Sequence, residues 1–199
     1  MHILKNFNMP DMAEKHAFVN KFGFGVIISG SLTGTHLPFY LRADEGVAGT
    51  LYSHCSRANP HWKELDGAEV LVIFSGPHSY ISPSWYSQSP AVPTWNYASV
   101  HAYGVVSLLD KEQTIEAVEN ITSKYEPELL ITKDILTDAY RDKLLSGIVG
   151  FKVELSHLEG QSKIGQNRKK QDQVQVFDAL SNSKNLDNLA LANYMQPFM

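Results

Sequence analysis

The stretch at residues 148–158 reads IVGFKVELSHL. Its apolar residues Val149, Phe151, Val153 and Leu155 recur at every second position, with polar or small residues between them. Successive side chains of a β-strand point to opposite faces of a sheet, so this period of two predicts a long strand with one side facing a core. Such a strand supplies one face of a barrel.

The rest of the chain supplies partner strands. Residues 68–74 are nearly all apolar and lie between Gly67 and Gly76, which predicts a central strand buried on both faces. Six or seven strands joined mainly by hairpins predict a mainly β fold, an antiparallel barrel with peripheral helices, because the strand-helix alternation of a parallel sheet is missing. The other predicted strands are 24–28 and 37–41, which form a hairpin, then 49–55 and 97–109, the last bent at Gly104.

Helical signals occur between and after the strands. Asp11 and Glu14 form a capping-box pattern, and Asn59 before Pro60 is a favourable helix start. Three prolines between Ser82 and Thr94 predict a long loop. With 199 residues, the chain is predicted to be a single domain over 1–199, with 160–199 as a C-terminal polar loop and helical extension. The later helices are predicted over 111–125, 134–145, 174–180 and 186–195.

Composition excludes several classes of protein. Mean hydropathy is −0.21 and no stretch has the roughly 18 uninterrupted apolar residues of a membrane span. Residues 1–14 contain no apolar core typical of a secretory signal, so we expect a cytoplasmic protein without membrane contact. Cys55 is the single cysteine, which excludes an internal disulfide. The net charge of −4 means that any nucleic-acid binding needs a local basic patch.

One polar cluster has the composition of an anion site. Residues 53–62 read SHCSRANPHW. Hydroxyl groups, an imidazole and the Arg57 guanidinium therefore lie where a predicted strand ends and a helix begins. Backbone amides at a helix start and an arginine fork both suit phosphate oxygens. The alternative interpretation is that Asn59 only caps the helix and Arg57 is solvated.

Two further clusters are less specific. The first contains four flat rings, which either line a site for an aromatic ligand or anchor their own loop to the core. They are Trp85, Tyr86, Trp95 and Tyr97. The segment 158–168 is either functional or a solvated polar loop. The histidines show no metal-ligand spacing, so we expect no metal site, and no glycine-rich nucleotide fingerprint is present. His54 and Cys55 point to opposite faces of a strand, which excludes a ready-made thiolate and base.

At these clusters the chain resembles the PaiB family of FMN-binding negative transcriptional regulators, whose fold is the FMN-binding split barrel. The shared runs keep the family order from about residue 10 to about residue 170. They are THLP at 35–38, SRANP at 56–60, GPH at 76–78, YISPSWY at 80–86, VPTWNY at 92–97, VH at 100–101, LEG at 158–160 and QNR at 166–168.

The resemblance implies an antiparallel split β-barrel and a homodimer that holds FMN in a groove between its subunits. The resemblance places Ser56 and Arg57 at the flavin phosphate. Toward the flavin ring or the neighbouring subunit it places Trp95, Tyr97, Gln166 and Arg168. No catalytic residue is predicted. The full set of expected cofactor-binding residues is Thr35, His36, Ser53, His54, Ser56, Arg57, Asn59, Trp95, Tyr97, Gln166 and Arg168.

Three functions are compatible with this resemblance. The favoured one is an FMN-binding regulatory protein. The alternative is a flavin-dependent oxidoreductase that acts on an unidentified small molecule, since the same groove would admit a reductant and an acceptor. The third is a repressor that contacts DNA directly through the basic run of Lys163 and residues 168–170, which would add to the first function.

Overall fold

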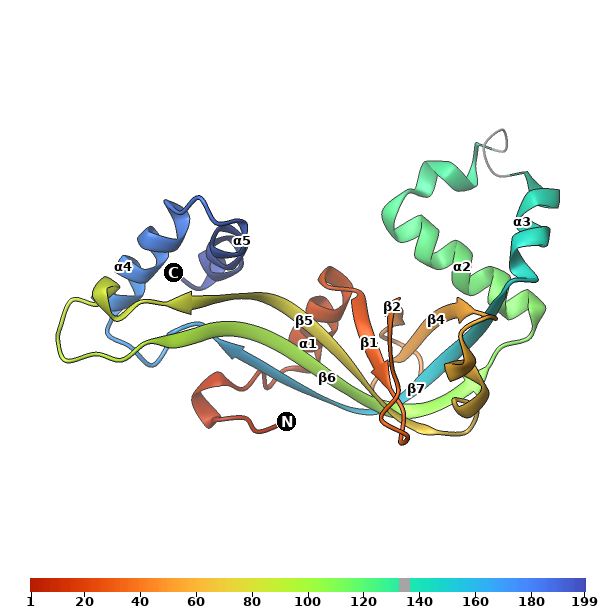
Figure 1. Cartoon of the computed structure of the whole chain (residues 1–199), viewed down its shortest axis with the longest axis horizontal. Coiled ribbons are helices and arrows are strands. Elements are labelled where there is room, and N and C mark those ends of the chain that lie inside the picture. Colours follow the sequence, from red (N-terminus) through yellow and green to blue (C-terminus); the bar gives the residue numbers. More distant parts are fainter. Residues whose placement is uncertain (133–136) are drawn as a thin grey trace. The chain divides into compact units, whose positions relative to one another are not determined.

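The computed structural model describes residues 1–132 and 137–199 and contains one seven-stranded sheet (Figure 1). The strand order is β2-β1-β5-β6-β7-β4-β3, and β1 with β2, β1 with β5, β3 with β4 and β4 with β7 pair antiparallel. The mainly β split-barrel prediction is therefore confirmed. The strands are β1 (Phe24–Ile28), β2 (Gly34–Pro38), β3 (Tyr40–Arg42), β4 (Thr50–Ser56), β5 (Glu69–Ile81), β6 (Thr94–Leu108) and β7 (Ile148–Lys163).

Helices occupy the positions that the sequence indicates. An Asp110–Gln113 capping box begins α2, which has the predicted bounds. Of the helix predicted over 134–145, residues 134–136 lie outside the described residues and the rest begins at Asp138. Among the described residues, no helix has the length and apolar character needed to cross a membrane. The α-helices are α1 (Met12–Lys21), α2 (Lys111–Tyr125), α3 (Asp138–Leu145), α4 (Lys170–Ser181) and α5 (Leu186–Met195).

Internal contacts divide the chain into two compact units. We call residues 12–74 and 101–159 the barrel unit, and residues 1–11, 75–100 and 160–199 the terminal unit. The strands β5, β6 and β7 contribute residues to both units. The prediction of a single domain over 1–199 with an extension from residue 160 stays a prediction.

Phe39 closes the core of the barrel unit. It separates β2 from β3, which lie at the two opposite edges of the sheet order. Its side chain is fully buried and meets the ring of Phe74 on β5 at 5.5 Å and the ring of Phe151 on β7 at 6.4 Å, both edge to face. The single strand predicted over 37–41 is therefore wrong, because Pro38 ends one strand and Tyr40 begins another after the core-filling ring.

The prediction that the strand at 68–74 is buried on both faces is also wrong. Val70, Val72 and Phe74 are buried, whereas Leu71 and Ile73 are only half-buried. The strand also continues past Pro77 to Ile81. Its pairing with β1 runs only from Leu71 to Phe74, and a residue without an N–H donor is tolerated on the unpaired side beyond it.

Gly104 lets β6 and β7 approach each other in the barrel unit. A Cβ atom at this position would lie 2.3 Å from the backbone oxygen of Glu154, closer than any van der Waals contact. The glycine that the sequence indicates as a bend therefore sits inside a continuous strand and is required by the close approach of backbone.

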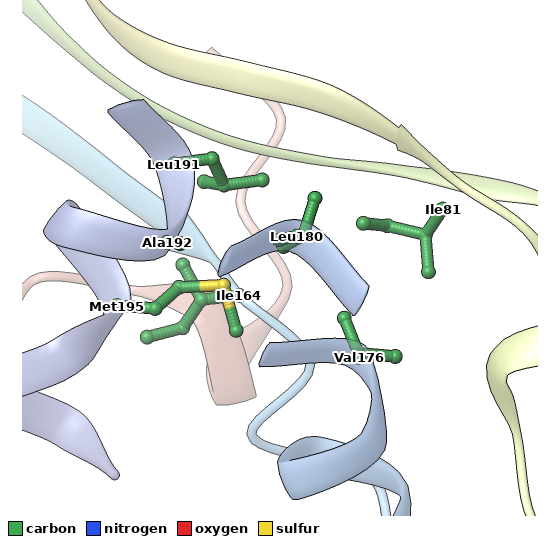
Figure 2. Close-up of a cluster of buried hydrophobic side chains, with 7 residues drawn as sticks. All are labelled: Ile81, Ile164, Val176, Leu180, Leu191, Ala192 and Met195. Carbon is green, nitrogen blue, oxygen red and sulfur yellow. The ribbon is translucent and has the colours of Figure 1, made fainter. Parts of the chain in front are cut away.

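The terminal unit has its own apolar core. Figure 2 shows α4 and α5 side chains gathered with Ile81 of β5 and with Ile164, which follows β7. Trp85 and Tyr86 pack against this cluster, and Trp85 lies in a short 3-10 helix, Pro83–Trp85, inside the predicted loop. The buried members are Ile81, Ile164, Val176, Leu180, Leu191, Ala192 and Met195.

Candidate functional site

The chain turns sharply after β4, at residues 56–59, which we call the β4 corner. The Arg57 N–H donates to the Gly147 carbonyl at 2.8 Å, and the Asn59 N–H donates to the Ser56 carbonyl at 2.9 Å. The Ser56 hydroxyl oxygen accepts from the Ala58 N–H at 3.2 Å. Asn59 then caps a 3-10 helix, Pro60–Glu64, through a bond from the His61 N–H. The expected helix start is correct, but this single turn is too short to supply an anion site of its own.

The Arg57 side chain is fixed in place. Its Nε donates to the Ser146 carbonyl at 3.0 Å, and its Nη2 donates to the Ile148 carbonyl at 2.9 Å. The guanidinium also lies 5.9 Å from the Trp62 ring, whose Nε1 donates to the Arg57 carbonyl. These bonds use two of the five N–H donors of an arginine, so the others remain available to an anion. Arg57 is exposed, as the alternative interpretation expects, but backbone carbonyls hold its guanidinium in one place.

A cavity of about 410 Å³ lies beside Arg57 in the barrel unit. Its other walls come from the start of α2, including Lys111 and Thr114, and from the first residues of β7, including Ile148 and Gly150. Two basic side chains therefore border it, together with the Asp110 carboxylate that caps α2. The volume falls within the range of small-molecule sites.

Hydrogen bonds join the β4 corner to β2. The Thr35 hydroxyl lies 2.8 Å from His61 Nδ1 and accepts from Asn59 Nδ2 at 3.2 Å. On the far side of the ring, Glu64 lies 3.7 Å from His61 Nε2 and accepts from the hydroxyls of Ser29 and Ser31. This chain of bonds fixes Thr35 and Asn59 with respect to each other.

His61 is the buried centre of this network. The residue is 3% exposed, and its Nε2 has no hydrogen-bond partner among the described residues. Burial lowers the pKa of His61, with a smaller opposing effect from the Glu64 carboxylate. The ring is therefore neutral at pH 7. The expected set of site residues does not include His61, although its place directly after the Asn-Pro corner is visible in the sequence.

Three expected residues of the barrel unit make their contacts away from the β4 corner: Ser53, His54 and His36. Ser53 is fully buried, and its hydroxyl donates to the Pro38 carbonyl at 2.7 Å. His54 points to the other face of β4, and burial lowers its pKa because its Nδ1 is desolvated without a partner. His36 is exposed and its ring stacks on Phe24 at 6.2 Å.

Four expected residues lie in the terminal unit. Trp95 and Tyr97 line one cavity of about 370 Å³ together with Gly76 and His78. Gln166 bonds to its own loop, accepting from the Ile164 N–H and donating to the Ser162 carbonyl. The Arg168 guanidinium lies 4.5 Å from the Tyr86 ring. The eleven expected residues thus divide between the units, seven in the barrel unit and four in the terminal unit.

Metal ligands are not gathered at either place. Within residues 1–132 and 137–199, no group of three or more histidine, cysteine, aspartate or glutamate side chains could hold a metal ion. What the β4 corner offers comes from its own groups: the Arg57 guanidinium and the Ser56 hydroxyl can both donate to an anion beside the cavity.

Comparisons with known proteins point to the same kind of ligand. The family described as "Putative FMN-binding domain" matches residues 1–157. The protein named protease synthase and sporulation protein PAI 2, from Bacillus subtilis, is 36% identical over 98% of this chain and 97% of its own length. An uncharacterized protein of Emericella nidulans is 28% identical over 76% of each chain.

Solved structures share the fold at low sequence identity. The flavocytochrome Anf3 of Azotobacter vinelandii superposes with a TM-score of 0.65 at 15% identity, over 87% of this chain and 78% of its own. An FAD- and heme-binding protein of Mycobacterium smegmatis has a TM-score of 0.60 at 11% identity, over 84% and 78%.

The buried His61 makes stability depend on pH. Because its pKa is lower in the folded chain, the unfolded chain binds more protons as the pH falls through about 6.5, so acid destabilises the fold. We expect the free energy of unfolding, measured with urea, to fall between pH 7.5 and 5.5 by up to about 1.4 kcal/mol per pH unit for this group. His61→Gln should reduce the pH dependence, and replacement of the exposed His2 by Gln should leave it unchanged. Equal pH dependence in the chain and in His61→Gln would contradict the role of His61.

Proposed function

The chain belongs to this family of FMN-binding domains, with FMN as its cofactor, and from that premise we propose that the flavin lies at an interface between two copies of the chain with its phosphate at the β4 corner. Arg57 supports this placement most directly. Its guanidinium is held by two backbone carbonyls at the border of a cavity, with N–H donors left for phosphate oxygens.

The groups around Arg57 fit a phosphate ester. The Ser56 hydroxyl is exposed at the end of β4 and can donate to an anion while it accepts from the Ala58 N–H. Thr35 and Asn59 lie next to each other, because the Thr35 hydroxyl accepts from the Asn59 side chain and also bonds to the His61 ring. These residues orient and bind the phosphate end, whereas bound FMN would supply electron-transfer chemistry at its ring.

An apolar face of the sheet supports the proposed dimer. Val26 lies opposite Ile73, and Ile28 lies opposite Leu71, so these half-buried side chains share one face of β1 and β5. Phe24 continues this face and is 63% exposed. An antiparallel sheet that meets water on one side normally carries polar residues there, and an apolar face of this kind is typical of an interface.

Regulation is the proposed role of the bound flavin. Support comes from the 36% identical relative, whose name connects it with protease synthesis and sporulation. We propose that this chain is a negative transcriptional regulator in which FMN binding accompanies dimerisation. The flavin-dependent oxidoreductase, direct association with DNA and a cytoplasmic location stay predictions.

Arg57→Ala should weaken FMN binding by roughly 10- to 150-fold, the equivalent of the ~1.5–3 kcal/mol of a hydrogen bond to a charged group. Titration of the purified chain with FMN, followed by quenching of flavin fluorescence, measures this loss. Arg42→Ala is the matched control, since Arg42 pairs with Glu116 away from the corner. Equal affinity of Arg57→Ala and the unchanged chain would contradict the proposed phosphate site.

Phe24→Glu should convert the dimer into a monomer, because a carboxylate would be buried without a partner in the apolar interface. Light scattering coupled to size-exclusion chromatography would report a mass near 22.3 kDa for the variant and twice that for the chain itself. Val47→Glu is the control, since Val47 is 93% exposed in the turn before β4. A monomeric unchanged chain that binds FMN fully would contradict the shared site.

A further inference from the structure

A second cavity of the terminal unit has a different chemistry from the β4 corner. Its volume is about 300 Å³, and its walls include Tyr80, Trp85, Trp95 and Asp187. Three aromatic rings and one carboxylate therefore border the same space. Trp85 and Trp95 are among the rings expected to line an aromatic ligand, but no expected function of the chain uses the carboxylate beside them.

The aromatic side of the cavity is already assembled. His78 and Tyr80 occupy alternate positions of β5 and so lie on the same face, while Ser79 between them is buried. The Trp95 ring of β6 lies 6.2 Å from the His78 ring and 6.3 Å from the Tyr80 ring. Trp95 is 54% exposed and Tyr80 is 46% exposed, so ring surface remains open to a ligand.

The polar side of the cavity comes from the start of α5. Asn185 caps the helix by accepting from the Asp187 N–H at 2.8 Å. Asn188 accepts from the buried Ser79 hydroxyl and donates to the Ser183 hydroxyl, so its amide oxygen and its amide nitrogen each already have a partner. The Asp187 carboxylate differs: it is exposed in the first turn of α5, and none of the ion pairs found among the described residues includes it. It is the one charged group on the cavity wall.

We propose that this cavity binds an organic ammonium ion, a primary or quaternary amine of small size. The faces of tryptophan and tyrosine rings attract cations, and an aromatic cage with one carboxylate is the arrangement that recognises ammonium groups. Asp187 repels phosphates and carboxylates, so the site selects against the anionic end of a flavin. A neutral ligand would make no ionic contact with this exposed carboxylate. The proposal stands independently of FMN binding.

Trp95 gives the site a built-in signal. It lines this cavity and also the one that contains Tyr97, so occupancy of the ammonium site changes the surroundings of this indole. Binding of a cation against the ring face should therefore change tryptophan fluorescence. Flavin absorbance, read separately, distinguishes failure of this site from failure of FMN binding.

The test titrates the full-length chain with choline and with phenethylammonium at constant ionic strength, following tryptophan fluorescence and checking affinity by calorimetry. The neutral isostere of choline, 3,3-dimethylbutan-1-ol, is titrated in parallel. We expect saturable binding of at least one ammonium ion and affinity at least about tenfold lower for the neutral compound, which corresponds to the loss of one cation–π or ionic contact.

Two variants and one control complete the test. Asp187→Asn and Trp95→Leu should each weaken ammonium binding by about tenfold or more. Asp178→Asn, an exposed carboxylate on α4 outside the cavity, should have no effect. If Asp187→Asn fails to fold, as judged by circular dichroism, Trp95→Leu alone decides. No saturable binding of either ammonium ion, equal binding of the neutral isostere, or binding unchanged in the folded variants would overturn the proposal.

Discussion

The closure of the barrel depends on one buried ring. Pro38 and Tyr40 are two residues apart, so their Cα atoms are at most about 7 Å apart. They nevertheless belong to β2 and β3, the two edges of a seven-stranded sheet that would be roughly 29 Å wide if it were flat. The sheet must therefore curl until its edges meet. Phe39, between them, fills the enclosed space against Phe74 and Phe151.

The candidate phosphate site is a consequence of this curl. In the strand order β2 and β4 are separated by four other strands, yet Thr35 of β2 bonds to Asn59 directly after β4. Only a closed sheet brings these two segments together. The His61 network then fixes their spacing, and the carbonyls at the start of β7 hold Arg57. The geometry of the β4 corner is thus set by barrel closure more than by the short helix that follows it.

Much of this was predictable from the sequence because the signals are local. Alternation of apolar residues predicted β7, their helical spacing predicted α2, and the motif 56–60 predicted the end of β4 and the helix start after it. The break at Phe39 was not predictable, because an apolar residue in a strand pattern looks the same whether it pairs or fills a core. The half-exposed face of β5 was also missed, since an unbroken run of apolar residues looks the same whether one or both of its faces are buried. The carbonyl partners of Arg57 are about 90 residues away in sequence, a separation that no local pattern reveals.

The most direct test of the account compares FMN with riboflavin, which has the same ring and lacks the phosphate. If the β4 corner holds the phosphate, the chain should bind FMN roughly 10- to 150-fold more tightly than riboflavin, and Arg57→Ala should remove most of that difference while changing riboflavin affinity little. Equal affinity for the two flavins in the unchanged chain would show that the corner does not hold the phosphate, and the central claim would be wrong.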